Sequence, residues 1–262
     1  MRTLAATAIA RDPAAADWLG RRPGQLLKYL VCRRFASVPA QEIAETVWGF
    51  TGFASSGSVR HCVHELRERL EPDREAGARS TSIVARQGGY TLDPAAVGVD
   101  ADDFAVHVRR GLVARAAGLP EVATVHLRVG VAMYRGEFMA DEPEAAWAVA
   151  ERERLREHLE DALVALAGLR AAAGDLDGAL CCLRRAAELE PFDCDVHRSL
   201  ITVLLRQGRH SRAQRCYAAF AARLERELHR QPGFELADLA GELLDPAGEL
   251  PGAQAEPQTL SP

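Results

Sequence analysis

The hydrophobic positions in the first third of the chain predict three helices followed by a hairpin. Apolar residues three or four apart indicate helices, whereas short apolar runs bounded by turn residues indicate strands. By this criterion the helices cover about residues 23–35, 39–48 and 58–70, and the strands cover residues 82–85 and 90–92. Gly88 and Gly89 supply the backbone freedom that a tight turn between the strands needs. This order is that of a winged helix-turn-helix domain, which we assign to residues 1–92.

After a linker at about residues 93–100, helical spacing continues with no convincing strand, so we expect a mostly α fold. The pattern runs from Asp102 to about Leu244, and we assign residues 99–244 to a second, helical domain. Residues 245–262 are rich in Pro, Gly, Gln and Glu, which predicts a disordered tail.

A repeat supports the second domain. Gly174 and Gly208 are 34 residues apart, as are Ala179 and Ala213, and residues 118–123 repeat the order of a turn glycine followed by a small residue. This is the length of a tetratricopeptide repeat, in which a small side chain lets the paired helices approach closely. We therefore expect a tetratricopeptide-like domain. The alternative is chance spacing in an alanine-rich chain.

The charge of the chain is divided unequally. Residues 1–92 carry 13 lysine and arginine residues against 9 acidic ones, a net charge of +4. Residues 93–262 carry 19 against 28, a net charge of −9. A basic module joined to an acidic one suggests that the first domain alone approaches an anion such as nucleic acid.

The third helix carries the candidate DNA-binding residues. Its apolar stripe, which should face the core, consists of Val59, Val63, Leu66 and Leu70. The polar candidates are Arg60, His61, His64 and Arg67 on this helix and Arg86 beside the hairpin turn. Such a helix fits the major groove, where arginine bonds guanine, and an arginine in the wing can reach phosphate or the minor groove.

Other charged residues include some that favour DNA binding and some that oppose it. Lys28, Arg33 and Arg34 on the first helix could add phosphate contacts. Glu65 and Glu68 on the third helix would repel phosphate, and a solvated charged face is the plain alternative for any one of these residues.

The residues favour neither an enzyme nor a metal or cofactor site. The sequence contains no G-x-S-x-G, H-E-x-x-H or G-x-G-x-x-G motif, and its Walker-like glycines at positions 52 and 57 lack the phosphate-binding lysine. His61 and His64, three residues apart, could hold a metal, but no carboxylate or cysteine completes a ligand set with them. The six cysteines form no C-x-x-C, so we expect them to be small buried residues. The run at residues 151–154 predicts a solvated helix face with ion pairs.

The chain also predicts no membrane association. No apolar run approaches the roughly 18 residues that span a bilayer. The apolar stretch at residues 4–10 is short and weakly hydrophobic for a secretory signal. We therefore expect a cytoplasmic protein.

Short motifs in both domains carry a family resemblance. The first domain resembles the OmpR-type winged helix in its Trp48-Gly49 pair, its L-R-x-x-L sequence at residues 66–70 and its R-x-G-G-Y hairpin at residues 86–90. The second is similar to the bacterial transcriptional activator domain at residues 99–104, 134–138, 147–155 and 231–236. Together the motifs cover about residues 20–244 and resemble the Streptomyces antibiotic regulatory protein type of activator.

The resemblance implies a sequence-specific DNA-binding transcription activator whose winged helix is of the phosphorelay output type. Such a protein binds double-stranded promoter DNA, recruits RNA polymerase to a biosynthetic gene cluster, such as one for an antibiotic, and uses its helical domain for homodimer contacts. The alternative is a helical-repeat scaffold with a degenerate winged helix. Three features favour this alternative. The family opens with a small sheet, whereas residues 1–20 show no clear strands; Glu65 and Glu68 introduce acidic charge on the third helix; and the tetratricopeptide-like half makes up most of the chain.

Overall fold

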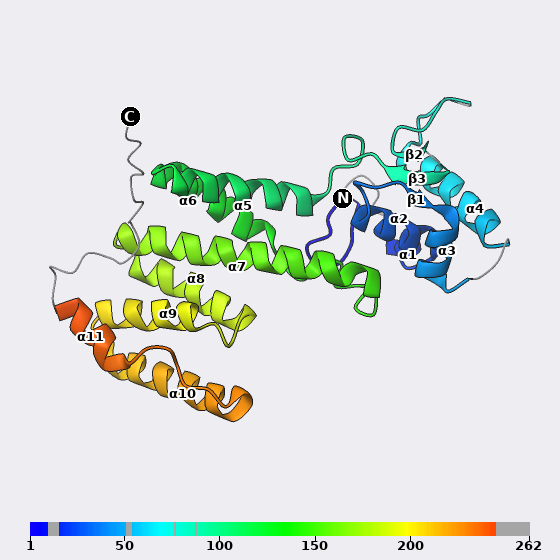
Figure 1. Ribbon diagram of the computed structural model, residues 1–262. Coiled ribbons are helices and arrows are strands. Elements are labelled where there is room, and N and C mark those ends of the chain that lie inside the picture. Colours follow the sequence, from blue (N-terminus) through cyan, green and yellow to red (C-terminus); the bar gives the residue numbers. More distant parts are fainter. Residues whose placement is uncertain (10–15, 51–53, 76, 87, 245–262) are drawn as a thin grey trace, which may run out of the picture. The chain divides into compact units, whose positions relative to one another are not determined.

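The computed structural model describes residues 1–9, 16–50, 54–75, 77–86 and 88–244. The chain forms two compact units, Met1–Leu166 and Ala167–Pro262. Figure 1 shows their helices and strands. The boundary between the units lies within a long helix rather than at the linker that follows the hairpin. The tail expected at residues 245–262 lies outside the described residues.

The first unit begins with the winged helix-turn-helix, and its elements occur in the predicted order. They are α1 (Ala16–Leu19), α2 (Arg22–Cys32), β1 (Val38–Pro39), α3 (Ala40–Trp48), α4 (Ala54–Leu70), β2 (Ile83–Arg86) and β3 (Gly89–Leu92). The prediction began α4 at Ser58, four residues late, because the Ala- and Ser-rich segment before it carries no apolar stripe. The apolar face of α2 was expected to reach Phe35, but the helix ends at Cys32 and the Phe35 side chain is 77% exposed.

The apolar stripes of α2 and α4 pack as the pattern predicted. The side chains of Leu26, Leu27, Leu30 and Val31 in α2 and of Val59, Val63 and Leu66 in α4 are at most 1% exposed. Leu70, at the end of α4, is only half-buried. The opposite side of α4 is therefore turned to solvent.

A three-stranded antiparallel sheet in the order β1-β3-β2 completes this domain. The sequence did not predict β1, because a strand of two residues has no alternation to detect. Gly88 adopts a positive φ of 79°, as the hairpin turn requires. Gly89 is needed for a different reason, since a Cβ at that position would lie 2.5 Å from the carbonyl oxygen of Val38 in β1.

The same unit continues into the helical region with α5 (Asp100–Ala116), α6 (Pro120–Met133), the 3-10 turn η2 (Ala146–Ala148) and α7 (Val149–Ala172). The prediction of almost continuous helix was wrong between α6 and η2. There the chain is irregular, and the N-terminal residues pack against it. Leu4 forms an isolated bridge to Phe138, and the Thr3 amide and hydroxyl both donate to Asp100. The described residues 1–9 form isolated bridges, and the sequence had shown no clear strands there.

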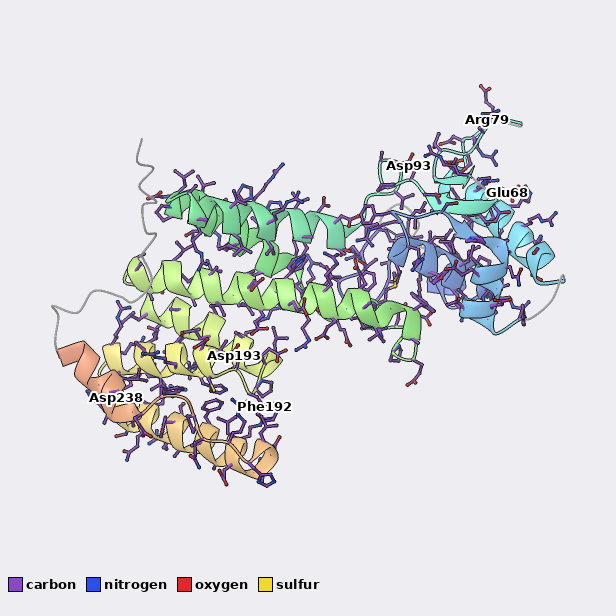
Figure 2. All side chains as sticks on the ribbon, in the orientation of Figure 1. Glu68, Arg79, Asp93, Phe192, Asp193 and Asp238 are labelled. Carbon is purple, nitrogen blue, oxygen red and sulfur yellow. The ribbon has the colours of Figure 1, made fainter. Side chains whose placement is uncertain are left out.

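The second unit contains the end of α7 followed by α8 (Leu176–Leu189), α9 (Cys194–Arg206), α10 (His210–Leu228) and α11 (Leu236–Leu244). Gly174 and Gly208 both have positive φ in the turns between helices, and Ala179 and Ala213 are fully buried one turn later. Asp193, labelled in Figure 2, accepts hydrogen bonds from the first amides of α9. The 34-residue spacing thus corresponds to two similar helix-turn-helix pairs.

Candidate nucleic-acid interface

Arg60 and Arg86 lie together on the wing side of α4. Both are exposed, and both line a hollow of about 420 Å³ with Ser56, Gly88 and Tyr90. The antiparallel pairing of β2 with β3 holds Arg86 opposite Gly89, at the hairpin turn. The structure therefore brings two of the five predicted residues, one from the third helix and one from the wing, to a single surface.

His61 lies on the other side of α4. It lines a separate hollow of about 560 Å³ with Ser58, Arg21 and Arg22. The sequence prediction did not single out the two arginines, which stand immediately before the first apolar stripe. The adjacent pair of cations at the start of a helix was the signal that could have found them.

The acidic residues of α4 are engaged by basic neighbours on the same helix. Glu65 accepts from Arg69 at 2.8 Å, and Glu68 lies 3.3 Å from Nε2 of His64. Figure 2 labels Glu68 on α4. The i, i+4 pair of Glu65 with Arg69 reduces the repulsion of phosphate that the sequence predicted for Glu65.

Arg67 is directed at the sheet. Its Nε and Nη2 donate to the carbonyl oxygen of Ile83, at 3.0 and 2.8 Å, so its guanidinium ties α4 to β2. This contact fixes the wing relative to the third helix. Base contact by Arg67 stays a prediction.

Glu71 holds the start of the wing. Its Oε1 accepts from the backbone amides of Thr81 and Ser82 at 2.7 and 2.6 Å, and its Oε2 lies 3.1 Å from Nε of Arg74. Although burial alone would raise it, the hydrogen bonds from Ser82 and Thr81 lower the pKa of Glu71 to about 2. The loop between α4 and β2, with Arg79 near its tip in Figure 2, is thus anchored at its base.

Two of the phosphate contacts predicted for the first helix are wrong, because the side chains of Lys28 on α2 and Arg34 just after it are buried in ion pairs with the helical region. The Lys28 ammonium is 1% exposed and lies 2.6 Å from Asp141 and 2.7 Å from Glu142. The Arg34 guanidinium is equally buried and bonds Asp102 and Glu151.

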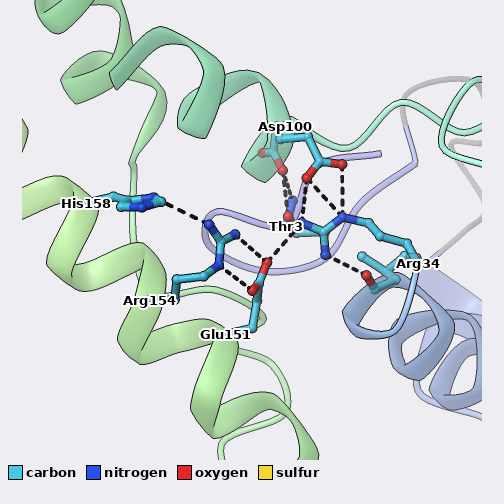
Figure 3. Close-up of polar contacts among 8 residues, drawn as sticks. Thr3, Arg34, Asp100, Glu151, Arg154 and His158 are labelled. Carbon is cyan, nitrogen blue, oxygen red and sulfur yellow. Dashed lines mark hydrogen bonds and ion pairs between the residues drawn. The ribbon is translucent and has the colours of Figure 1, made fainter. Parts of the chain in front are cut away.

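Figure 3 shows Arg34, in the turn that follows α2, reaching toward carboxylates of the helical region. Its Nε lies 2.9 Å from each carboxylate oxygen of Asp102, and its Nη2 lies 2.9 Å from Glu151. Burial would raise the pKa of Glu151, but the hydrogen bonds from Arg154 and Arg34 hold it below its usual value. Arg33, the third predicted contact, caps the C-terminal end of α2 and remains half exposed beside Glu42.

The run at residues 151–154 is only partly the solvated face that the sequence predicted. Its i, i+3 pair between Glu151 and Arg154 is present at 2.8 Å. Arg152, however, is 8% exposed and donates to the carbonyl oxygens of Phe138 and Met139. An arginine that satisfies several backbone carbonyls explains how the irregular segment before η2 is held without regular structure.

The cysteines are all free, and they differ in burial. Cys62 and Cys182 are buried as expected, whereas Cys181 is exposed. Within the part of the chain that the structure describes, no group of three or more potential metal ligands gathers. The same residues contain no helix with the length and apolar character needed to cross a bilayer.

Comparisons with known proteins match both halves of the chain. The model of the bacterial transcriptional activator domain matches residues 99–244, and that of the C-terminal domain of transcriptional regulatory proteins matches residues 18–92. A search of the curated proteins finds no significant match.

A solved structure of Mycobacterium tuberculosis EmbR in complex with a low affinity phosphopeptide has a similar fold, with a TM-score of 0.75 and 23% identity. The match covers 93% of this chain but 64% of the EmbR chain. The chain belongs to the bacterial transcriptional activator domain family, and its winged helix followed by that domain is the architecture of the Streptomyces antibiotic regulatory protein type of activator.

Proposed function

We propose that this protein activates transcription by binding promoter DNA in a sequence-specific manner through α4 and the wing. The single observation that carries the proposal is the pairing of Arg60 with Arg86 around one hollow. No described acidic side chain forms an ion pair with either guanidinium, so both are available to an anion. A helix arginine beside a wing arginine suits a duplex, because the first can reach base edges while the second contacts the backbone.

The test compares Arg60→Ala with Arg86→Ala on a specific and a random duplex. We expect Arg60→Ala to cost about 1–3 kcal/mol on the specific site and to relax the preference at one base pair. We expect Arg86→Ala to weaken binding to both duplexes alike, because a phosphate contact carries no sequence information. Equal losses on the two duplexes for Arg60→Ala would contradict its base-reading role. The specific duplex comes from the DNA upstream of the protein's own gene neighbourhood.

We further propose that the protein recruits RNA polymerase and controls a biosynthetic gene cluster, such as one for an antibiotic. Exposed apolar side chains in the α5–α6 hairpin support a protein partner. Each is about half exposed or more, and they are Val113 on α5, Leu119 in the turn and Val122 and Val125 on α6. Exposed apolar patches mark interaction surfaces. Transcription in vitro with purified polymerase tests recruitment, and the mass of the protein in solution tests the homodimer that we also propose.

The same function places the protein in the cytoplasm, where promoter DNA is. It also needs no catalytic group or cofactor. The alternative of a scaffold with a degenerate winged helix loses part of its support, since the charge of Glu65 is paired with Arg69. Weak binding to both duplexes with no salt dependence would favour that alternative over the activator.

A further inference from the structure

The hollow on the α2 side of α4 is built from basic and hydroxyl side chains. Arg21 and Arg22 contribute from the start of α2, and Ser58 and His61 contribute from α4. All four are exposed or half-exposed, so an anion in solution can reach them. The hollow also lies at the N-terminal end of α2, where the helix dipole favours negative charge.

Arg22 is fixed in place before any ligand arrives. Its guanidinium carbon lies 4.7 Å from the ring centre of Phe50 and 5.9 Å from that of Trp48. The Trp48 ring is itself held by a 3.2 Å hydrogen bond from its Nε1 to Gln25. An arginine resting on two rings loses little side-chain freedom when it binds, which favours recognition of a planar or tetrahedral anion.

The charges in this hollow leave a net positive site. Neither Arg21 nor Arg22 forms an ion pair with an acidic side chain in the described parts of the chain. Glu65 is the acidic residue that lines the hollow, and it is already paired with Arg69 at 2.8 Å. The two arginines are therefore unneutralised, while the nearby carboxylate is largely compensated.

We propose that this hollow holds a phosphate of the DNA backbone, with Arg22 as its main contact and Arg21, Ser58 and His61 around it. The proposal rests on the DNA-binding function. It follows from the position of the hollow across α4 from the one that contains Arg60 and Arg86. A helix in the major groove lies between two sugar-phosphate strands, so basic hollows on both sides of it match the two walls of the groove.

The first experiment measures the salt dependence of DNA binding for wild type, Arg22→Gln and the matched control Arg110→Gln. Arg110 is an exposed arginine on α5, so both variants lose one surface charge. Losing one phosphate contact should reduce the slope of log K against log salt by about 1 for Arg22→Gln on specific and random duplexes alike. The control should keep the wild-type slope.

The second experiment removes the phosphate charge instead of the arginine. Neutral methylphosphonate is placed, one position at a time, along each strand that borders the major groove. Wild type should lose severalfold affinity at one position on the strand opposite the wing, and Arg22→Gln should be insensitive to that substitution. This comparison does not depend on the absolute stability of the variant, because each protein is compared with itself.

The outcomes separate the pocket from the function. Two results would overturn the phosphate site while leaving DNA binding intact. In the first, wild type binds DNA with a steep slope of log K against log salt, and Arg22→Gln has the same slope. In the second, wild type and Arg22→Gln are equally sensitive to every methylphosphonate. Wild type that binds no duplex overturns both proposals. Replacing chloride by inorganic phosphate at constant ionic strength tests competition for the hollow. We expect weaker wild-type DNA binding that Arg22→Gln does not share, because free phosphate then competes with the DNA phosphate at Arg22.

Discussion

Replacing Arg34 by methionine should destabilise the first unit more than any nearby surface change. Methionine keeps the length and apolar character of the side chain but removes the guanidinium. The structure shows what is lost: the bonds from Nε and Nη2 to Asp102, the bond from Nη2 to Glu151 and the 2.7 Å bond from Nη1 to the carbonyl oxygen of Val31. The two carboxylates would stay in place, facing an uncharged side chain.

The magnitude follows from the burial of the partners. Breaking a buried ion pair by removing one partner costs about 3–5 kcal/mol, because a charge is left without compensation. Arg34 is 1% exposed, but Asp102 and Glu151 retain 30% and 13% of their exposure, and Glu151 keeps its pair with Arg154. Water can therefore reach the orphaned carboxylates, which places the expected loss at the lower end, about 3 kcal/mol.

Urea denaturation followed by circular dichroism measures this loss, with Arg33→Met as the matched control. Arg33 is the preceding residue, is 50% exposed and lies 3.7 Å from Glu42, so its replacement should change the free energy of unfolding by less than about 1 kcal/mol. If Arg34→Met costs no more than the control, the ion pair does not hold α2 to the helical region and the reasoning fails.

Two further changes test how the wing is built. Glu71→Gln should cost about 2 kcal/mol at neutral pH, because hydrogen bonds to a charged group are lost. Since the pKa of Glu71 is lowered from 4.5 to about 2, its contribution is present above about pH 4.5 and is lost as the pH falls toward 2. The gap between wild type and variant in urea titrations should thus narrow between pH 5 and pH 3, and a constant gap would contradict the assignment. Gly89→Ala should lower the free energy of unfolding by about 1–3 kcal/mol, because its Cβ would lie 2.5 Å from the Val38 carbonyl oxygen. If Gly89→Ala unfolds at the same temperature as wild type in a thermal scan, the close approach of β1 and β3 is not needed for stability.

The sequence predicted those parts of the fold that depend on local pattern. The buried stripe of Val59, Val63 and Leu66 was predictable because residues on one helix face recur at a fixed spacing. β1 was missed, since its two residues pair only because Gly89 allows close approach. The irregular segment between α6 and η2 was missed as well, because it is held by contacts from residues far away in sequence, such as Leu4.

The candidate site was predictable only in part, for the same reason. Arg60 and Arg86 could be paired from the sequence because the helix and the hairpin of a winged helix have a known relation. Nothing local distinguishes Arg34 from Arg33, yet one is buried and the other is half exposed. What separates them is an acidic partner 68 residues away, which only the tertiary structure reveals.

This burial changes how the charge of the first domain is to be understood. Residues 1–92 carry 13 basic side chains and a net charge of +4. The charges of Lys28 and Arg34, however, are paired with acidic residues of the helical region. Without these two cations the same residues carry a net charge of +2, so overall charge attracts DNA less than the sequence suggests. Affinity must then come from a few well-placed arginines. The steepness of the salt dependence therefore reports on the residues around the two hollows beside α4, and not on the basic character of the domain as a whole.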